Sequence, residues 1–378
     1  MKKTLIFVIF LLSFTMNLNA GIINKSAKYT RYDDSTTGLG DNVQEALDNL
    51  DASSGGISKY DATVGTTGAD YTTISAAIAT GKSRLLLVDD VTETASFNMP
   101  DNFLLEGTGK YGFNLNMGIY KFLDNSGANQ GFDIINIKIT FAYTVAGNLF
   151  NPNNTDTGKY VFENVYFDNN STVASSLVFN NTSNNCKTFA NDIVLDLPNF
   201  NGCGWKDRHS NLANFFIIGG GTNCGDCLIL SFANVKGISF SGTFATSITT
   251  IEGTSSVISN ISMEGNITIG RLEITDCDIS GVNLYAGAFY VEGDNNNISN
   301  CHTGTITVPS GSNFNNFSNF RTTGTVSVTG NDTGITGCTL NALTINSGAT
   351  RTRIGLTATN TAISDSGTGT VGVGNIVY

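Results

Sequence analysis

The chain has 378 residues, 42 of them glycine, and a formal net charge of −11. Only 13% of its residues are charged, about half the usual share for soluble domains, so hydroxyl and amide side chains must provide much of the solubility. This acidic balance excludes the usual nucleic-acid-binding surface, which concentrates lysine and arginine, and leaves neutral ligands such as glycans open.

Residues 1–20 have the pattern of a secretory signal peptide. Lys2 and Lys3 precede an apolar stretch, Thr4 to Met16, which is too short to span a bilayer comfortably, and Ala20 offers a cleavage point. A retained membrane anchor is the alternative. No later segment of the sequence is long and apolar enough for a transmembrane helix, so we expect no stable membrane span after removal of residues 1–20.

Residues 21–68 form a polar, turn-rich segment that contains one expected helix. Asp41 can cap a helix over Asn42–Leu50, in which the apolar residues fall on one face. The run from Tyr32 to Asp51 resembles the lead-in segment of phage tail-fibre and tailspike proteins, which joins the particle-bound end to a trimeric distal part. The resemblance implies attachment to a virion and a homotrimer.

Residues 69–378 begin with a short amphipathic helix over Tyr71–Ile78, which Gly81 ends. Apolar strands follow at Leu85–Val88 and Phe103–Gly107. This order resembles the opening of the pectin-lyase-like β-helix superfamily, in which a short helix covers the open end of the solenoid. The resemblance implies an all-β fold: a right-handed, single-stranded parallel β-helix with short N-terminal helices.

An internal repeat in the C-terminal half predicts the same architecture. In each copy, an apolar residue, two small or polar residues and a second buried position precede an apolar–polar–apolar strand. The copies recur at a short and fairly regular spacing, which stacked coils need because each coil buries its apolar face against its neighbours. The middle of the chain reads as further coils with larger insertions. We predict that the starting residues form one vertical column inside the solenoid: Ile258, Ile274, Ile298, Phe317 and Ile335, with further copies at Val235 and Ile354.

The seven cysteines do not form a dense disulfide pattern. Cys277, Cys301 and Cys338 fall at the same repeat position, which favours an inward stack of apolar thiols over a metal or redox site. Cys224 and Cys227 form a lone CxxC pair, for which a disulfide and a zinc site both stay open. We assign no residue to a metal and expect no cofactor.

The densest polar cluster of the chain runs from Trp205 to His209 and contains its only tryptophan. It follows three residues rich in glycine, which predicts a loop. Protein sites that bind sugars combine a flat aromatic ring with a guanidinium group, which has several N–H donors, and a carboxylate. We therefore predict a ligand-binding site at Trp205, Asp207, Arg208 and His209, with a plain exposed loop or a subunit contact as the alternative.

Glycoside hydrolysis requires two carboxylates that face one bond, and on a β-helix they can come from neighbouring coils. No pair in the sequence stands out, so no catalytic residue is assigned, and no lyase motif is evident. The candidate carboxylates form three groups: Asp89, Asp90 and Glu93; Asp276 and Asp278, which should face outward beside an inward cysteine; and Glu292 and Asp294.

Two functions are compatible with these features. The first is a virion tail spike or fibre that contacts a host-surface polysaccharide, which the lead-in at residues 32–51 favours. The second is a secreted or surface β-helix protein of a bacterium, either an adhesin or a polysaccharide-degrading enzyme (a lyase or a glycoside hydrolase), which the signal segment favours. Whether the chain is an enzyme stays open.

Overall fold

The computed structural model describes residues 59–123, 131–145, 147–150, 158–172, 177–181, 187–197, 204–219, 228–244, 249–263, 266–267, 269–355, 357–361, 363–373 and 376–377. The chain divides into two compact units, Met1–Asp61 and Ala62–Tyr378, and every described strand lies in the second. The signal segment, the Asn42–Leu50 helix, the phage-like lead-in and the CxxC pair lie outside the described residues.

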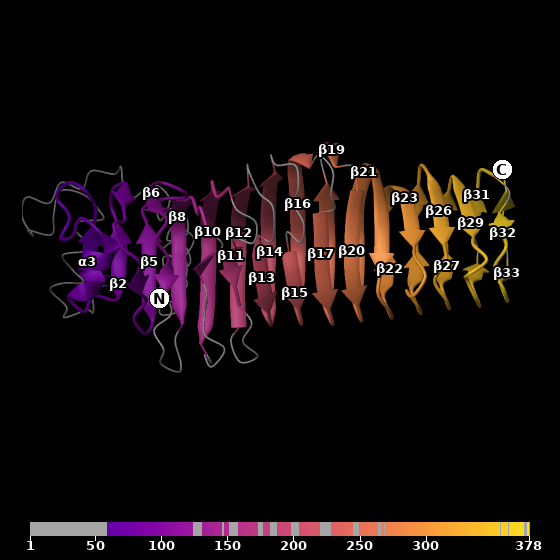
Figure 1. Ribbon diagram of the computed structural model, residues 1–378, viewed down its shortest axis with the longest axis horizontal. Helices are drawn as coiled ribbons and strands as arrows, with labels where there is room; N and C mark the ends of the chain where they lie inside the picture. Colours follow the sequence, from indigo (N-terminus) through magenta and orange to yellow (C-terminus); the bar gives the residue numbers. More distant parts are fainter. Residues whose placement is uncertain are drawn as a thin grey trace, which may run out of the picture. The chain divides into compact units, whose positions relative to one another are not determined.

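Within Ala62–Tyr378, strands follow one another along one axis in chain order (Figure 1). They form three ladders, and each coil of the chain adds one rung to each. The first ladder contains β1 (Ala62–Val64), β2 (Arg84–Leu87), β5 (Phe103–Gly107), the first parts of β8 (Phe132–Phe141), β10 (Lys159–Asn169), β12 (Lys187–Leu197), β14 (Ser210–Gly219), β16 (Asn234–Phe244), β18 (Val257–Met263) and β21 (Asp278–Glu292), then β22 (Asn297–Ser299), β24 (Asn316–Ser318), β27 (Gly334–Thr336), β30 (Arg353–Gly355) and β33 (Val371–Val373).

The second ladder takes the later parts of these long strands, which bend within their length. It contains β3 (Val91–Thr92), β6 (Asn114–Gly118), the second parts of β8 to β18, the middle of β21, β19 (Asn266–Ile267), the start of β23 (His302–Val308), β25 (Arg321–Thr322), β28 (Thr339–Leu340), β31 (Ala358–Thr359) and β34 (Ile376–Val377).

The third ladder completes each coil. It contains β4 (Phe97–Asn98), β7 (Phe122–Leu123), β9 (Asn148–Phe150), β11 (Leu177–Asn180), β13 (Trp205–Arg208), β15 (Leu228–Ser231), β17 (Thr249–Thr254), β20 (Ile269–Thr275), the ends of β21 and β23, β26 (Thr325–Val328), β29 (Ala342–Ile345) and β32 (Ser364–Asp365).

All strand pairings between the described coils are parallel. A chain whose successive coils pair in this way is a single-stranded parallel β-helix, so the predicted fold is confirmed. The first rung, β1, already lies before residue 69, where the sequence suggested that the solenoid begins.

One continuous column of inward residues runs along the first ladder. The length of chain between its members varies: it is shortest from Phe317 to Ile335 and longest from Leu105 to Ile134, where the coil carries an insertion. These side chains are buried, and at about 1.5–3 kcal/mol for each fully buried large apolar side chain they stabilise the stack of coils. The column consists of Ala62, Leu85, Leu105, Ile134, Phe162, Ala190, Leu212, Val235, Ile258, Ile279, Ile298, Phe317, Ile335 and Ile354.

The predicted column is correct except at one rung. Ile274 pairs with Gly253 in the third ladder, and Ile279 takes the place between Ile258 and Ile298. The sequence misled because Ile274-Thr275-Asp276-Cys277 has the same apolar–polar–polar–apolar pattern as the true copies. Both segments are inward-facing, so the hydrophobic pattern alone does not distinguish the two ladders.

Each long strand bends between the first and second ladders at a single residue with positive φ. Asparagine and glycine adopt this left-handed conformation readily, which explains why Asn ends the repeated Ile-Ser-Asn motif. Neighbouring bends also bond to each other, since Asn164 Nδ2 donates to Asn136 Oδ1 at 2.9 Å. The residues at this bend are Asn136, Asn164, Asp192, Asn214, Gly237, Asn260, Gly281, Asn300, Asn319 and Gly337.

The predicted cysteine stack is confirmed in burial but not in alignment. Cys277, Cys301 and Cys338 are all buried free thiols, and burial raises the pKa of Cys301 to about 12. Cys301 and Cys338 belong to one column, with Phe320 between them. The Cys301 carbonyl accepts from Arg321 N–H, next to Phe320, and the Phe320 carbonyl accepts from Thr339 N–H, next to Cys338. Cys277 lies in a different corner column, one residue before the first ladder.

The short helix predicted over Tyr71–Ile78 is present as α3, Ile74–Ala79, and packs against β1 and β4. Its first amide groups are satisfied by side chains from two places in the sequence. Thr73 Oγ1 accepts from Ala76 N–H at 3.2 Å, while Glu93 accepts from Ile74 N–H at 2.6 Å and from Ser75 N–H at 3.3 Å. Glu93 is 2% exposed, and its burial raises the pKa of the carboxyl.

We expect Glu93→Ala to lower the free energy of unfolding by about 3 kcal/mol, because it leaves two amide donors of α3 without their acceptor. Glu93→Gln keeps one acceptor oxygen and should lose less. Urea denaturation measures both values. Asp101→Ala, at an exposed carboxylate, is the control and should change stability by less than about 0.5 kcal/mol. Equal losses for Glu93→Ala and Asp101→Ala would contradict the capping role.

Candidate functional site

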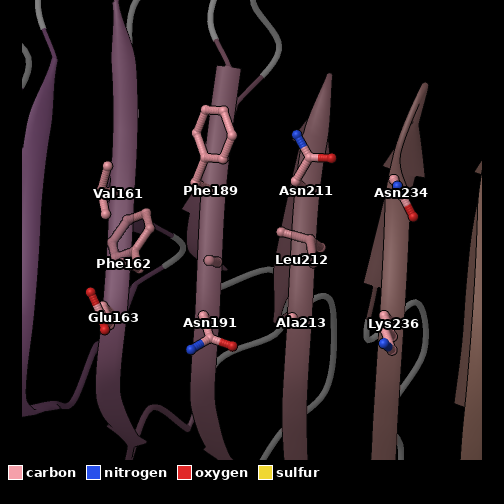
Figure 2. A pocket seen from close by; sticks show the side chains of 11 residues that line it. Val161, Phe162, Glu163, Phe189, Asn191, Asn211, Leu212, Ala213, Asn234 and Lys236 are labelled. Atoms are coloured by element: carbon pink, nitrogen blue, oxygen red, sulfur yellow. The ribbon is translucent and has the colours of Figure 1, made fainter. Parts of the chain in front are cut away.

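A groove of about 460 Å³ crosses four neighbouring strands on the outer wall of the first ladder. It lies over β10, β12, β14 and β16, and Figure 2 shows the side chains that line it arranged in rows across these four strands. The inward members of the same strands belong to the buried column, so the wall beneath the groove is fixed by the core. The outward side chains that line it are Val161, Glu163, Phe189, Asn191, Asn211, Ala213, Asn234 and Lys236.

Two registered rows of side chains make this surface. In the second row, Glu163, Asn191, Ala213 and Lys236 lie side by side on successive strands. Ala213 is small, which leaves room between the amide of Asn191 and the ammonium of Lys236. The row therefore has a carboxylate at one end, a cation at the other and a hollow between them.

The first row combines apolar surface with amides. Val161 and Phe189 are in register with Asn211 and Asn234, so an apolar patch continues into a pair of carboxamides. The ammonium group of Lys159 lies 4.8 Å from the centroid of the Phe189 ring. Each exposed carboxamide offers donors and an acceptor, the groups needed to bind hydroxyls.

The structure corrects the predicted site at Trp205–His209. Trp205 and Asp207 are 0% and 1% exposed, and they point into the solenoid from β13 instead of lying on a surface loop. The Trp205 ring packs in an aromatic core, 4.7 Å from the Phe179 centroid, so it offers no plate to a ligand on the outer wall. Arg208 and His209 are only partly buried.

His209 is the member of the predicted set that lies next to the groove. It occupies a corner of the coil with a φ of 56° and comes two residues before Asn211, which lines the groove. Its imidazole stacks on Phe232, with 5.1 Å between ring centroids and 6° between ring planes. The sequence Trp-Lys-Asp-Arg alternates inward and outward residues, a pattern that indicates a strand and not a loop.

A second polar cluster lies on the second ladder and contains two carboxylates in register, Asp168 on β10 and Asp196 on β12. Lys138 Nζ is 2.8 Å from Asp168 Oδ2, and the Tyr166 hydroxyl donates a short hydrogen bond to Asp196. Burial and then this bond to Asp196 raise the pKa of the Tyr166 phenol. In-register residues on neighbouring strands are about 4.8 Å apart, so the carboxylates face the same stretch of wall.

The carboxylates singled out in the sequence have partners within the solenoid. Asp90 Oδ1 accepts from the backbone N–H of Asn114 at 2.8 Å, and Glu93 caps α3. Asp276 and Asp278 are exposed on either side of buried Cys277, as predicted. Their Oδ1 atoms accept from the amides of Asn295 and Asn297 in the next coil, at 3.0 and 2.9 Å.

Within the described residues, no cluster of three or more His, Cys, Asp or Glu side chains is placed to hold a metal ion. The helices among them include none with the length and apolar character that crossing a bilayer requires.

The ladders and their outer-wall groove define this chain as a parallel β-helix protein. Neither a family model nor a curated protein sequence matches it. Among solved structures, it is similar to the A-module of mannuronan C-5 epimerase AlgE6 from Azotobacter vinelandii, with a TM-score of 0.43 and 11% identity over 81% of this chain and 93% of that one. It is also similar to tailspike protein 3 of bacteriophage CBA120, with a TM-score of 0.32 and 13% identity over 97% and 68% of the two chains.

Proposed function

We propose that this chain is a polysaccharide-binding β-helix displayed on a virion, as a tail spike or fibre, and that the outer-wall groove is its glycan site. The observation that carries the proposal is the groove across β10, β12, β14 and β16, with its apolar patch and row of carboxamides. Four strands at about 4.8 Å spacing extend the site over roughly 14 Å, which suits an oligosaccharide better than a single sugar.

The chemistry of the groove also favours a glycan. Sugars present hydroxyls that pair with carboxamides and C–H faces that pack on apolar surface. The groove supplies Asn191, Asn211 and Asn234 for the first and Val161 with Phe189 for the second. Because successive coils repeat the same wall, a long polymer can continue along it beyond the groove.

Attachment to a virion and assembly as a homotrimer are part of the proposal. They are supported by the resemblance of residues 32–51 to phage lead-in segments, whereas the signal-like residues 1–20 support a secreted or cell-surface adhesin. Neighbouring genes for tail and capsid proteins would favour the virion, and genes for export would favour the adhesin. Light scattering of the purified full chain measures the oligomeric state, and a monomer would contradict the trimer.

A polysaccharide-degrading enzyme is the second candidate, and the cluster of Asp168, Asp196, Tyr166 and Lys138 favours it. Asp168 and Asp196 are in register on neighbouring strands, whose backbones are about 4.8 Å apart, and retaining glycoside hydrolases hold their two carboxyl groups roughly 5 Å apart. Size-exclusion chromatography of the glycan after incubation distinguishes cleavage from binding. Chain shortening that disappears in Asp196→Asn would establish an enzyme; tight binding without shortening would rule it out.

The groove is tested with affinity electrophoresis in native gels that contain polymannuronate, polygalacturonate, xylan or dextran. We expect Asn211→Ala combined with Lys236→Ala to weaken binding of the retained polymer about tenfold, since each change removes an exposed polar contact. Asn316→Ala is the matched control, because Asn316 lies in the same outward row as Asn234 but several coils away. Equal retardation of the double variant and the wild type would contradict the groove as the site.

A further inference from the structure

A ridge of left-handed residues runs along the corner between the third and first ladders. Each member except Gly369, the last, donates its backbone N–H to a carbonyl in the next coil. The residue after each member points inward, and the residue after that one points outward on the first ladder. We call this column the corner ridge. Its members are His209, Phe232, Ser255, Asp276, Asn295, Phe314, Asp332, Arg351 and Gly369.

Two members of the corner ridge are unusual for their backbone. Phe232 and Phe314 have φ values of 52° and 56°, a conformation that disfavours bulky residues. Both rings are also largely in solvent, with 54% and 55% of their surface exposed. Because both rings are exposed, burial of the side chain does not offset the conformational strain of the backbone at either residue. Strain of this kind is concentrated at functional sites.

The exposed ring of Phe232 stacks on a histidine and lies close in sequence to the groove. One face stacks on the His209 imidazole, whose Nδ1 is buried without a hydrogen-bond partner, so stacking on Phe232 orients the imidazole. Phe232 comes two residues before Asn234, as His209 does before Asn211, and both asparagines line the groove. The stacked pair therefore forms an aromatic edge along two strands of the groove.

We propose that His209 and Phe232 form a sugar-stacking subsite at the edge of the groove. This inference rests on the proposed glycan-binding function and deepens it. A pyranose ring lies with its C–H face on the aromatic edge, while its hydroxyls reach the carboxamides of Asn211 and Asn234. The subsite selects sugars that have an uninterrupted apolar face. The left-handed backbone of Phe232, although unfavourable, holds its ring in this exposed position.

The test compares Phe232→Asn with Phe314→Asn in the full chain, on the polymer that the wild type retains in the gels. Asparagine suits left-handed backbone, so both variants should fold and should show a small upward shift in Tm. We expect Phe232→Asn to raise the Kd for that polymer's oligosaccharides about tenfold, as the loss of one aromatic stacking partner. Phe314 has nearly the same φ and exposure but lies two residues before Asn316, outside the groove, so Phe314→Asn should bind like the wild type.

Phe232→Tyr keeps the ring and should retain wild-type affinity, which separates stacking from a general disturbance of the corner. An unchanged Kd for Phe232→Asn, while the Asn211 and Lys236 double variant loses binding, would overturn the subsite and leave the groove intact. Equal loss in Phe232→Asn and Phe314→Asn would also overturn it. If the double variant kept wild-type binding and Phe232→Asn lost it, the glycan would bind at the corner ridge. This result would contradict both the groove as the glycan site and a subsite at its edge.

Discussion

The fluorescence of Trp205 should titrate with a midpoint near pH 7, because its indole lies beside the buried carboxyl of Asp207. The Trp205 indole Nε1–H lies 3.3 Å from Asp207 Oδ2, and Asp207 is buried at 1% exposure. Burial raises the pKa of this carboxyl to about 7, against the opposing hydrogen bonds from Asn181, Thr188 and Trp205. Because the chain has one tryptophan, its emission reports this proton directly.

The same proton makes folding stability depend on pH. The folded state holds it up to about pH 7, whereas the unfolded carboxyl releases it near its ordinary value of 3.8. Between these values the folded state binds more protons, so the stability contributed by Asp207 is complete below pH 3.8 and is lost as the pH rises to about 7. The loss amounts to roughly 4 kcal/mol, at 1.36 kcal/mol per unit.

Asp207→Asn isolates this contribution, since an amide keeps one acceptor oxygen and has no proton to release. We expect the stability of the variant relative to the wild type to rise by roughly 4 kcal/mol between about pH 4 and pH 8, measured by urea denaturation. Its Trp205 emission should stay constant over this range. Asp276→Asn, at an exposed carboxylate, serves as the control. A difference between Asp207→Asn and wild type that does not vary with pH would refute the assignment.

The coil architecture could be predicted because its cause is local and repeated. Every coil must place an apolar residue on the first ladder, and the repeat from Ile258 to Ile354 records this requirement at a nearly constant spacing. The bends could be inferred for the same reason, because Asn or Gly recurs where the backbone turns left-handed. The one wrong member of the predicted column is Ile274. It lies on the third ladder, but the residues that follow it have the same apolar–polar–polar–apolar pattern as the copies on the first ladder.

The candidate site was harder to predict because it depends on register between coils. Glu163, Asn191 and Lys236 belong to different coils and are far apart along the chain, and only the strand pairing brings them into one row. Trp205 misled for a related reason. A tryptophan beside charged residues is compatible with a binding loop and with a strand. Trp205 is in a strand because the coils on either side bury its ring, and their residues are distant in the sequence.

Asn296→Ala should lower the free energy of unfolding by about 3 kcal/mol, because this buried side chain bonds to backbone groups of the preceding coil. Asn296 Oδ1 accepts from Cys277 N–H at 3.1 Å, and its Nδ2 donates to the Ile274 carbonyl and to Asn315 Oδ1, both at 2.8 Å. Asn315 repeats the arrangement one coil on, with Nδ2 donating to the Gly293 carbonyl at 3.0 Å. The two asparagines thus connect neighbouring coils inside the corner.

Urea denaturation of Asn296→Ala measures the loss, and Asn297→Ala is the control, since Asn297 is exposed and bonds to Asp278 on the outer wall. The control should change stability by less than about 1 kcal/mol. Amide hydrogen exchange locates the effect: protection should fall first at Cys277 and in the coils on either side, because each coil contacts only its neighbours. Uniform loss of protection from β2 to β30 would show instead that the solenoid unfolds as a single unit, with the corner asparagines contributing to its global stability.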